Sequence, residues 1–174
     1  MGRSHLEGSK KFVNSRTIDN SAGFSLLELL IVVAVIMIIA GIAIPNFIRS
    51  KMRANEAGAV SNMRTIATAS VVYNTTYGVG FAPSLPALGG DPSAPSAAQA
   101  GLIDSVLSSG VKNGYIFSYT VTASDANGNA QAYSVTADPI TPGTTGDRHF
   151  YTDQTAVIRD NLTTTAGPSD TPLQ

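Results

Sequence analysis

A run of 20 residues without a charged side chain, from Leu29 to Ile48, constrains this chain more than any other feature. A helix rises about 1.5 Å per residue, so a run of this length can cross the hydrocarbon core of a bilayer, which is about 30 Å thick. The run is apolar on every side, and such a helix needs lipid or other apolar helices all around it. We therefore predict a membrane-spanning helix near the N-terminus.

A carboxylate stands directly before this run. Glu28 follows Gly23-Phe24-Ser25-Leu26-Leu27. On insertion scales an acidic group deep in a bilayer costs about 2.5–3.5 kcal/mol, although less near the interface. Two interpretations stay open from the residues alone. The carboxylate is favoured by the helix dipole in a first turn, or it has a function that outweighs its cost.

The composition of the chain excludes several classes of function. The 174 residues are 43% hydrophobic, which suits one modest domain plus an apolar segment. No cysteine is present, so disulfides and thiolate metal sites are excluded. After Arg64 only three basic residues face eight aspartates. We expect an acidic, soluble C-terminal body without a basic patch for nucleic acid.

Two ordinary interpretations of the apolar run must be weighed. In a secretory signal peptide, Gly41-Ile42-Ala43 would supply a small-x-small cleavage site, and the mature chain would begin at Ile44. Glu28 and the long polar lead-in argue against this interpretation. The second alternative is a plain membrane anchor. Bases lie on both sides of the run, so charge does not decide its orientation.

The segments from Gly23 to Val33 and from Gly41 to Asn46 resemble the prepilin N-terminal segment of type IV pilins and secretion-system pseudopilins. The resemblance implies that a prepilin peptidase cuts after Gly23 and methylates the new terminus at Phe24. Glycine before the cut leaves the peptidase unobstructed. The resemblance also implies that Glu28 neutralises the terminal amine of a neighbouring subunit during assembly. Residues 1–23 would then be a cleaved basic leader, and 24–48 a transmembrane and filament-core helix.

Gly41 and Pro45 form a second feature of the apolar run. Proline inside a helix removes one backbone hydrogen bond and clashes with the carbonyl four residues earlier, which belongs to Gly41. We predict a helix kink or local melting near these residues. A proline that is simply tolerated in a membrane helix is the alternative. The resemblance implies a loss of helix there in the filament.

We predict an α+β fold, in which a long N-terminal helix packs on a four-stranded antiparallel sheet, as in pilins. The soluble head spans 49–174. It divides into an amphipathic helix at 49–77, a connecting loop at 78–110 and the sheet at about 111–174. Within the loop, the spacing of apolar residues from Leu102 to Leu107 predicts a short helix. Alternating residues predict strands over 115–121, 133–137, 149–152 and 156–159.

Polar residues of the head suggest no catalytic or metal site. Asp125 to Asn129 matches a hairpin turn better than a calcium loop, because glycine comes at the fourth position. His149 is expected to be a strand residue, and no catalytic triad can be assembled. Glu56 lies three residues after Arg53, which would permit an ion pair between them. Arg49, Lys51 and Arg53 are expected either to hold anionic lipid headgroups before assembly or to form a solvated collar.

The resemblance implies a structural subunit, not an enzyme, with no cofactor. It would form a homo-oligomeric helical filament and need a prepilin peptidase/methyltransferase, an assembly ATPase and an inner-membrane platform. The chain has no phosphate-binding loop of its own. It would lie in the inner membrane as a prepilin and then in a surface pilus. The major pseudopilin of a type II secretion system, in a periplasmic pseudopilus, is the alternative, and a secreted binding domain is a third. The absence of cysteines removes the disulfide-bounded C-terminal loop of many pilins, whereas the lack of a calcium constellation weakens the pseudopilin. Sequence separates the two poorly, and we favour the pilus.

Overall fold

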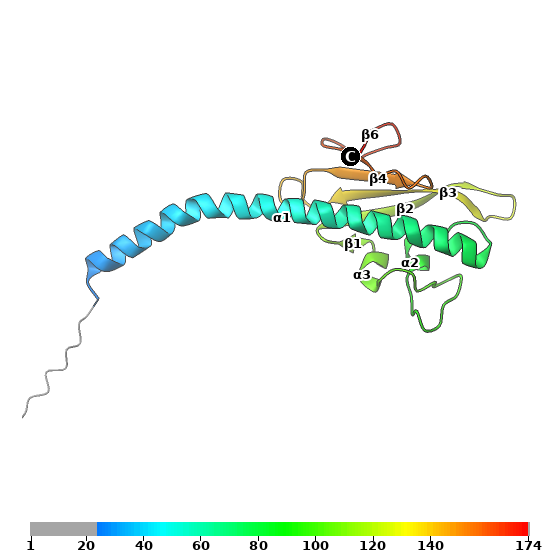
Figure 1. Cartoon of the computed structure of the whole chain (residues 1–174), viewed down its shortest axis with the longest axis horizontal. Coiled ribbons are helices and arrows are strands. Elements are labelled where there is room, and N and C mark those ends of the chain that lie inside the picture. Colours follow the sequence, from blue (N-terminus) through cyan, green and yellow to red (C-terminus); the bar gives the residue numbers. More distant parts are fainter. Residues whose placement is uncertain (1–23, 174) are drawn as a thin grey trace, which may run out of the picture. The chain divides into compact units, whose positions relative to one another are not determined.

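The computed structural model describes residues 24–173 (Figure 1). The predicted leader, residues 1–23, lies outside the described residues. The chain divides between Ala40 and Gly41 into two compact units, which are described one by one. Helix α1, Leu26–Tyr77, begins in the first unit and ends in the second.

The first unit contains the start of α1. Every side chain from Phe24 to Ile39 is exposed, although most of them are apolar. In the described part of the chain, α1 is the helix that is long and apolar enough to cross a membrane, judged by length and composition. The prediction of an apolar N-terminal helix is therefore confirmed.

In the second unit, α1 continues without interruption through Gly41 and Pro45 and ends at Tyr77, where the predicted amphipathic helix ends. The buried residues recur at helical spacing, so one face of α1 is turned toward the core. They are Met52, Ala59, Asn62, Met63, Ile66, Ala67, Ala69, Ser70 and Tyr73. This periodicity makes the head half of α1 amphipathic, as expected.

The sheet has six antiparallel strands in simple sequence order, and not the four that we predicted. The two additional strands are only two residues long, at the two edges of the sheet, and a pair of residues is too short to show alternation. The strands are β1 Val111–Lys112, β2 Tyr115–Ser124, β3 Ala130–Pro139, β4 His149–Asp153, β5 Arg159–Asn161 and β6 Thr171–Pro172.

The last predicted strand, 156–159, is displaced. Residues 154–156 form a turn, in which Ala156 has a left-handed φ of 59°. Strand β5 therefore starts at Arg159, which pairs with Tyr151 of β4. The α+β class and the antiparallel pairing are as predicted.

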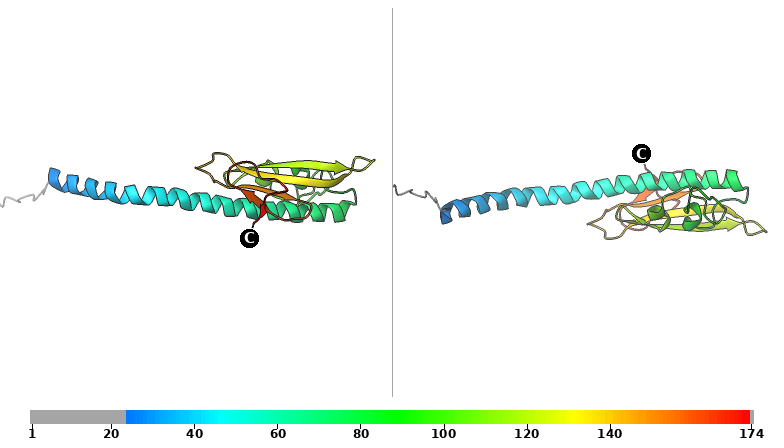
Figure 2. Two further views of the ribbon diagram at one scale, coloured as in Figure 1. Left: turned by 90° about the horizontal axis from the view of Figure 1, so that it is seen from above. Right: turned by 90° about the horizontal axis from the view of Figure 1, so that it is seen from below.

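Helix and sheet form two layers with one core between them (Figure 2). The long strands β2 and β3 contribute alternate side chains to it, as period-two alternation requires. Aromatic rings fill much of the volume. The rings of Tyr119 and Tyr133 are stacked, with their centroids 5.0 Å apart. The rings of Phe81 and Tyr133 form a T-shaped pair, with their centroids 4.9 Å apart. Aromatic pairs of this kind stabilise a core by more than the burial of their apolar surface alone.

The connecting segment is more ordered than a loop. It contains α2, Leu85–Leu88, which was not predicted, and α3, Ser105–Ser108, close to the predicted short helix. The carbonyl of Leu88 accepts hydrogen bonds from the N–H groups of Leu102 and Ile103. The segment thus folds back on itself and covers the core beside α1.

Candidate functional site

The residues around Glu28 form a capped helix start. The Ser25 hydroxyl accepts a hydrogen bond from the Leu27 N–H at 3.3 Å, and Oε2 of Glu28 accepts one from the Ser25 N–H at 2.9 Å. The first helical bond runs from the Leu29 N–H to the Ser25 carbonyl. Ser25 is therefore the N-cap, and the reciprocal bonds correspond closely to a capping box. This arrangement satisfies N–H groups that a helix start leaves free.

Ser25 was missed in the sequence analysis, although the pattern Ser25-Leu26-Leu27-Glu28 is a serine followed three residues later by glutamate. The structure also shows that Phe24 precedes the helix. One oxygen of Glu28 is used by the cap, and a carboxylate has further acceptor capacity.

The other residues of the predicted site are less informative. Gly23 lies outside the described residues. Gly41 and Pro45 lie in unbroken helix, and a side-chain carbon at Gly41 would meet nothing within 4 Å. The loss of helix at these two residues in a filament stays a prediction.

The outward face of α1 in the head carries two adjoining hollows, of about 380 and 430 Å³. Both are lined by Arg64, Thr68 and Val72. Val71 is 50% exposed and Val72 39% exposed. Among the described residues that line these hollows, Arg64 is the one charged side chain. This face is therefore mostly small and apolar, unlike an ordinary solvated helix face.

Polar side chains of α1 fix the helix to the loops at one end of the sheet. Asn55 donates to the Thr145 carbonyl at 2.8 Å. Oε1 of Glu56 accepts from the N–H groups of Asp147 and Arg148 at 3.0 and 3.3 Å. The proposed pairing of Glu56 with Arg53 is thus wrong: the carboxylate binds a loop more than 90 residues away, which spacing on the helix could not indicate.

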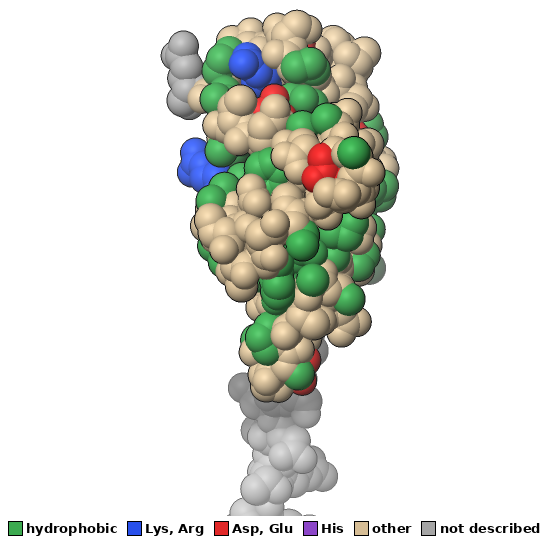
Figure 3. All heavy atoms as spheres, turned by 90° about the vertical axis from the view of Figure 1, so that its right-hand side faces the viewer, with side chains coloured by type: hydrophobic (Ala, Val, Ile, Leu, Met, Phe, Trp, Pro, Cys, Tyr) green, Lys and Arg blue, Asp and Glu red, His purple; other side chains and the backbone are tan. Residues whose placement is uncertain are grey.

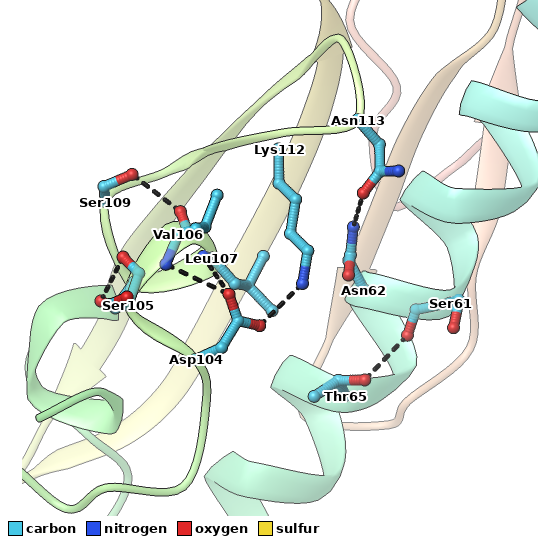
Figure 4. A network of polar contacts seen from close by, with 11 residues as sticks. Ser61, Asn62, Thr65, Asp104, Ser105, Val106, Leu107, Ser109, Lys112 and Asn113 are labelled. Carbon is cyan, nitrogen blue, oxygen red and sulfur yellow. Dashed lines mark hydrogen bonds and ion pairs between the residues drawn. The ribbon is translucent and has the colours of Figure 1, made fainter. Parts of the chain in front are cut away.

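A second set of contacts lies farther along α1 (Figure 4). The side chain of Asn62, which is buried, donates to Oδ1 of Asn113 at 3.2 Å. Beside it, Asp104 caps α3 and pairs with Lys112 at 2.7 Å. Hydrogen bonds from Lys112 and from the backbone of α3 hold the pKa of Asp104 below its ordinary value. The first contact joins α1 to the turn between β1 and β2, and the second joins the connecting segment to β1.

The polar residues that we set aside, Asp125 and His149, have hydrogen-bond partners within the head. Asp125 accepts hydrogen bonds from the N–H groups of Asn127 and Asn129 and from the Asn129 side chain, which lowers the pKa of Asp125. It therefore holds the β2–β3 turn, as the hairpin interpretation predicted. His149 lies in β4 beside Asp138. Within residues 24–173, no three His, Cys, Asp or Glu side chains are grouped to hold a metal ion.

The end of the head at which α1 stops shows few charged side chains (Figure 3). The surface there is mostly backbone, neutral polar groups and scattered apolar side chains. This face therefore offers no strongly charged patch for a nucleic acid or an acidic partner.

Comparison with known proteins finds similarities over parts of the chain. Residues 18–44 match the model described as the prokaryotic N-terminal methylation motif. The type IV major pilin protein PilA of Myxococcus xanthus is 47% identical over 55 residues. The chain is thus similar to type IV pilins over part of its length. The type IV wide pilus major component PilA4 of Thermus thermophilus is 51% identical over 37 residues.

These matches cover only part of the chain. The stretch shared with the Myxococcus protein covers 32% of this chain and 25% of that relative. The stretch shared with the Thermus protein covers 21% and 28%. The chain thus spans about a quarter of the length of the curated relatives that it matches. No solved structure matches the chain.

Proposed function

We propose that this chain is the structural subunit of a type IV pilus, and not an enzyme. It is made as a membrane-anchored prepilin, cleaved after Gly23, methylated on Phe24 and polymerised through α1. The observation that carries the proposal is the joint presence of the methylation motif at 18–44 and an apolar helix whose side chains from Phe24 to Ile39 are all exposed. Residues 1–23 are the leader, 24–48 the filament-core helix and 49–174 the head.

The outward face of α1 in the head supports polymerisation. In a filament built around α1, this face and the apolar run meet other copies of the helix. Lipid is as apolar as these side chains, so leaving the membrane gains little from the hydrophobic effect, and close packing and polar contacts must select the partners. Thr68 and Val72, which line both hollows of this face, allow close approach. Glu28 supplies the polar contact by pairing with the Phe24 amine of a neighbouring subunit, and one polar pair in an apolar seam fixes register.

The chain is the subunit of the filament, and other proteins process it and supply the energy for assembly. A prepilin peptidase/methyltransferase processes it, and an ATPase acting on an inner-membrane platform extracts it. The subunit then moves from the inner membrane to the cell surface. Gly41 and Pro45 mark the part of α1 that loses helix during this transfer.

A pilus is favoured over the pseudopilus of a type II secretion system. Both named relatives are pilus components. The residues that the structure describes contain no cluster of acidic side chains suited to calcium, which the alternative would favour. The type II pseudopilin stays the second candidate because it shares the N-terminal segment.

Intact mass and N-terminal sequencing of the native protein test the proposal. We expect a terminus at Phe24 that carries one additional methyl group. A terminus at Ile44 would show cleavage by signal peptidase and reject assembly. Cells that lack the gene then separate the two candidates, with surface filaments observed in electron micrographs and secretion measured as protein released into the medium. Loss of surface filaments indicates a pilus. Loss of secretion with filaments retained indicates a pseudopilus.

A further inference from the structure

Three arginines surround a hollow where the head begins. It measures about 390 Å³ and is lined by Arg49 and Arg53 from α1 and by Arg148 from the loop before β4, with Met52, Glu56, Asp147 and Leu162. Arg49 and Arg53 are one helical turn apart, so they lie on the same side of α1. Lys51 does not line the hollow, which separates it from the two arginines with which the sequence grouped it.

The charges of this hollow can be assigned one by one. Glu56 is held by two backbone N–H groups, and Arg148 pairs with Asp160 at 3.1 Å. The ion pairs of residues 24–173 include neither Arg49 nor Arg53. Asp147 is the second acidic residue that lines the hollow, besides Glu56. The three arginines that line the hollow outnumber its two carboxylates, Glu56 and Asp147, so the lining carries a net charge of +1, which suits one monoanion.

An apolar hollow of about 350 Å³ adjoins the charged one. Pro45, Ile48 and Gly143 line it, and Arg49, Met52 and Asp147 line both hollows. Arg49 is also the first charged residue after the apolar run. In a membrane-anchored chain it lies at the depth of the lipid headgroups, where the side chains of Arg and Lys meet lipid phosphates.

We infer that this double hollow binds a membrane phospholipid, with the phosphodiester between Arg49 and Arg53 and the glycerol end against Pro45 and Ile48. The planar guanidinium group donates paired hydrogen bonds to phosphate oxygens, and a charged acceptor strengthens them. A phosphodiester carries one negative charge, as the site requires, whereas inorganic phosphate near neutral pH carries more. The inference rests on the membrane-anchored state of the proposed function and not on polymerisation.

The test is native mass spectrometry of the full chain in detergent micelles, titrated with phosphatidylglycerol. The variant Arg49→Gln with Arg53→Gln removes both free cations. Its control, Lys51→Gln with Arg64→Gln, removes the same charge outside the hollow. We expect the pocket variant to lose about tenfold or more in lipid affinity and the control to lose less than about threefold, because charge-assisted hydrogen bonds require defined geometry.

Two further measurements complete the test. Inorganic phosphate in large excess should leave phosphatidylglycerol bound; displacement would assign the site to the free ion and overturn the lipid inference. Circular dichroism must show that both variants are folded. Equal loss of affinity in the two variants would mean an unspecific basic collar and would refute the site. Because binding is measured on single subunits, its failure is distinct from a failure of filament assembly.

Discussion

Substitutions at Ser25 and Glu28 separate the two functions that the first turn of α1 combines. Glu28→Gln keeps an oxygen that can accept the Ser25 N–H and removes the charge, since glutamine also serves in a capping box. Ser25→Ala removes the N-cap hydroxyl and keeps the charge. Glu28→Ala removes both the charge and the acceptor for the Ser25 N–H. If Glu28 acts in assembly through its charge, the glutamine variant should fail although its helix start is intact.

The expected losses in the equilibrium constant for subunit association differ by more than a factor of ten between loss of the cap and loss of the charge. Loss of an N-cap serine costs about 1 kcal/mol, or roughly fivefold in an equilibrium constant. Removal of one partner from a buried ion pair costs about 3–5 kcal/mol, which corresponds to roughly two to three and a half orders of magnitude. The Ser25 N–H bond at 2.9 Å is the contact that glutamine can keep. Glu28→Gln should therefore weaken subunit association far more than Ser25→Ala.

The assay compares processed subunits only. Each variant replaces the native protein in cells, mass spectrometry confirms a terminus at Phe24, and the fraction in sheared filaments is measured against the fraction left in the membrane. We expect Ser25→Ala to retain filaments and Glu28→Gln to lose nearly all of them. Filament yield within about twofold of the native level for Glu28→Gln would refute the pairing, and equal loss in both processed variants would show that helix capping alone is required.

The head offers three further tests by thermal unfolding of the full chain in detergent. Gly146→Ala should destabilise it by about 1–3 kcal/mol, because the added carbon would lie 2.1 Å from the Tyr115 hydroxyl. Tyr115→Phe should cost about 1 kcal/mol through loss of the 2.9 Å hydrogen bond to the Arg148 carbonyl. Lys112 and backbone N–H groups lower the pKa of Asp104. This carboxyl therefore stabilises the fold above its unfolded pKa of about 3.9, and its contribution is lost as pH falls through the lower folded value. Asp104→Asn, which can keep the cap, should reduce the loss of stability in acid.

Matched controls accompany these substitutions. Gly167→Ala places its carbon no closer than 4.0 Å to a neighbour, and it should leave the melting temperature nearly unchanged. Tyr151→Phe, at a half-buried strand position, should stay within about 0.5 kcal/mol. A stable Gly146→Ala protein would contradict the packing around Tyr115. An acid transition of Asp104→Asn identical to the native one would show that this carboxyl does not affect acid stability.

The long elements of the fold could be predicted from the sequence because each repeats its pattern several times. The head half of α1 shows helical spacing from Met52 to Tyr73, and β2 and β3 alternate in burial over eight of their ten residues. The two-residue strands β1 and β6 have no period to detect. Helix α2 lies in a segment rich in proline and glycine, where composition favours a loop.

The contacts of single polar residues were the hardest to predict. Glu56 binds N–H groups at 147 and 148, and only the folded chain brings these segments together. The same folding adds Arg148 to the two arginines of α1 and excludes Lys51. Ser25 is different, because its capping pattern is local and visible in the sequence. We interpreted the charge of Glu28 as a contact between subunits, and we did not consider that its carboxylate also takes part in the cap.

The capping bond of Glu28 and its proposed pairing in the filament are compatible. Oε2 accepts the Ser25 N–H, but this bond leaves the carboxylate charged and the other oxygen available. Before assembly the cap and the helix dipole lower the cost of keeping a charge near the membrane interface. That cost does not vanish, so a subunit still gains when a neighbouring ammonium approaches. The cap also orients the carboxylate at the very end of α1, which is where a newly formed terminus at Phe24 would be presented. Glu28 can therefore stabilise the unassembled subunit through the cap and also select the neighbouring subunit through its charge.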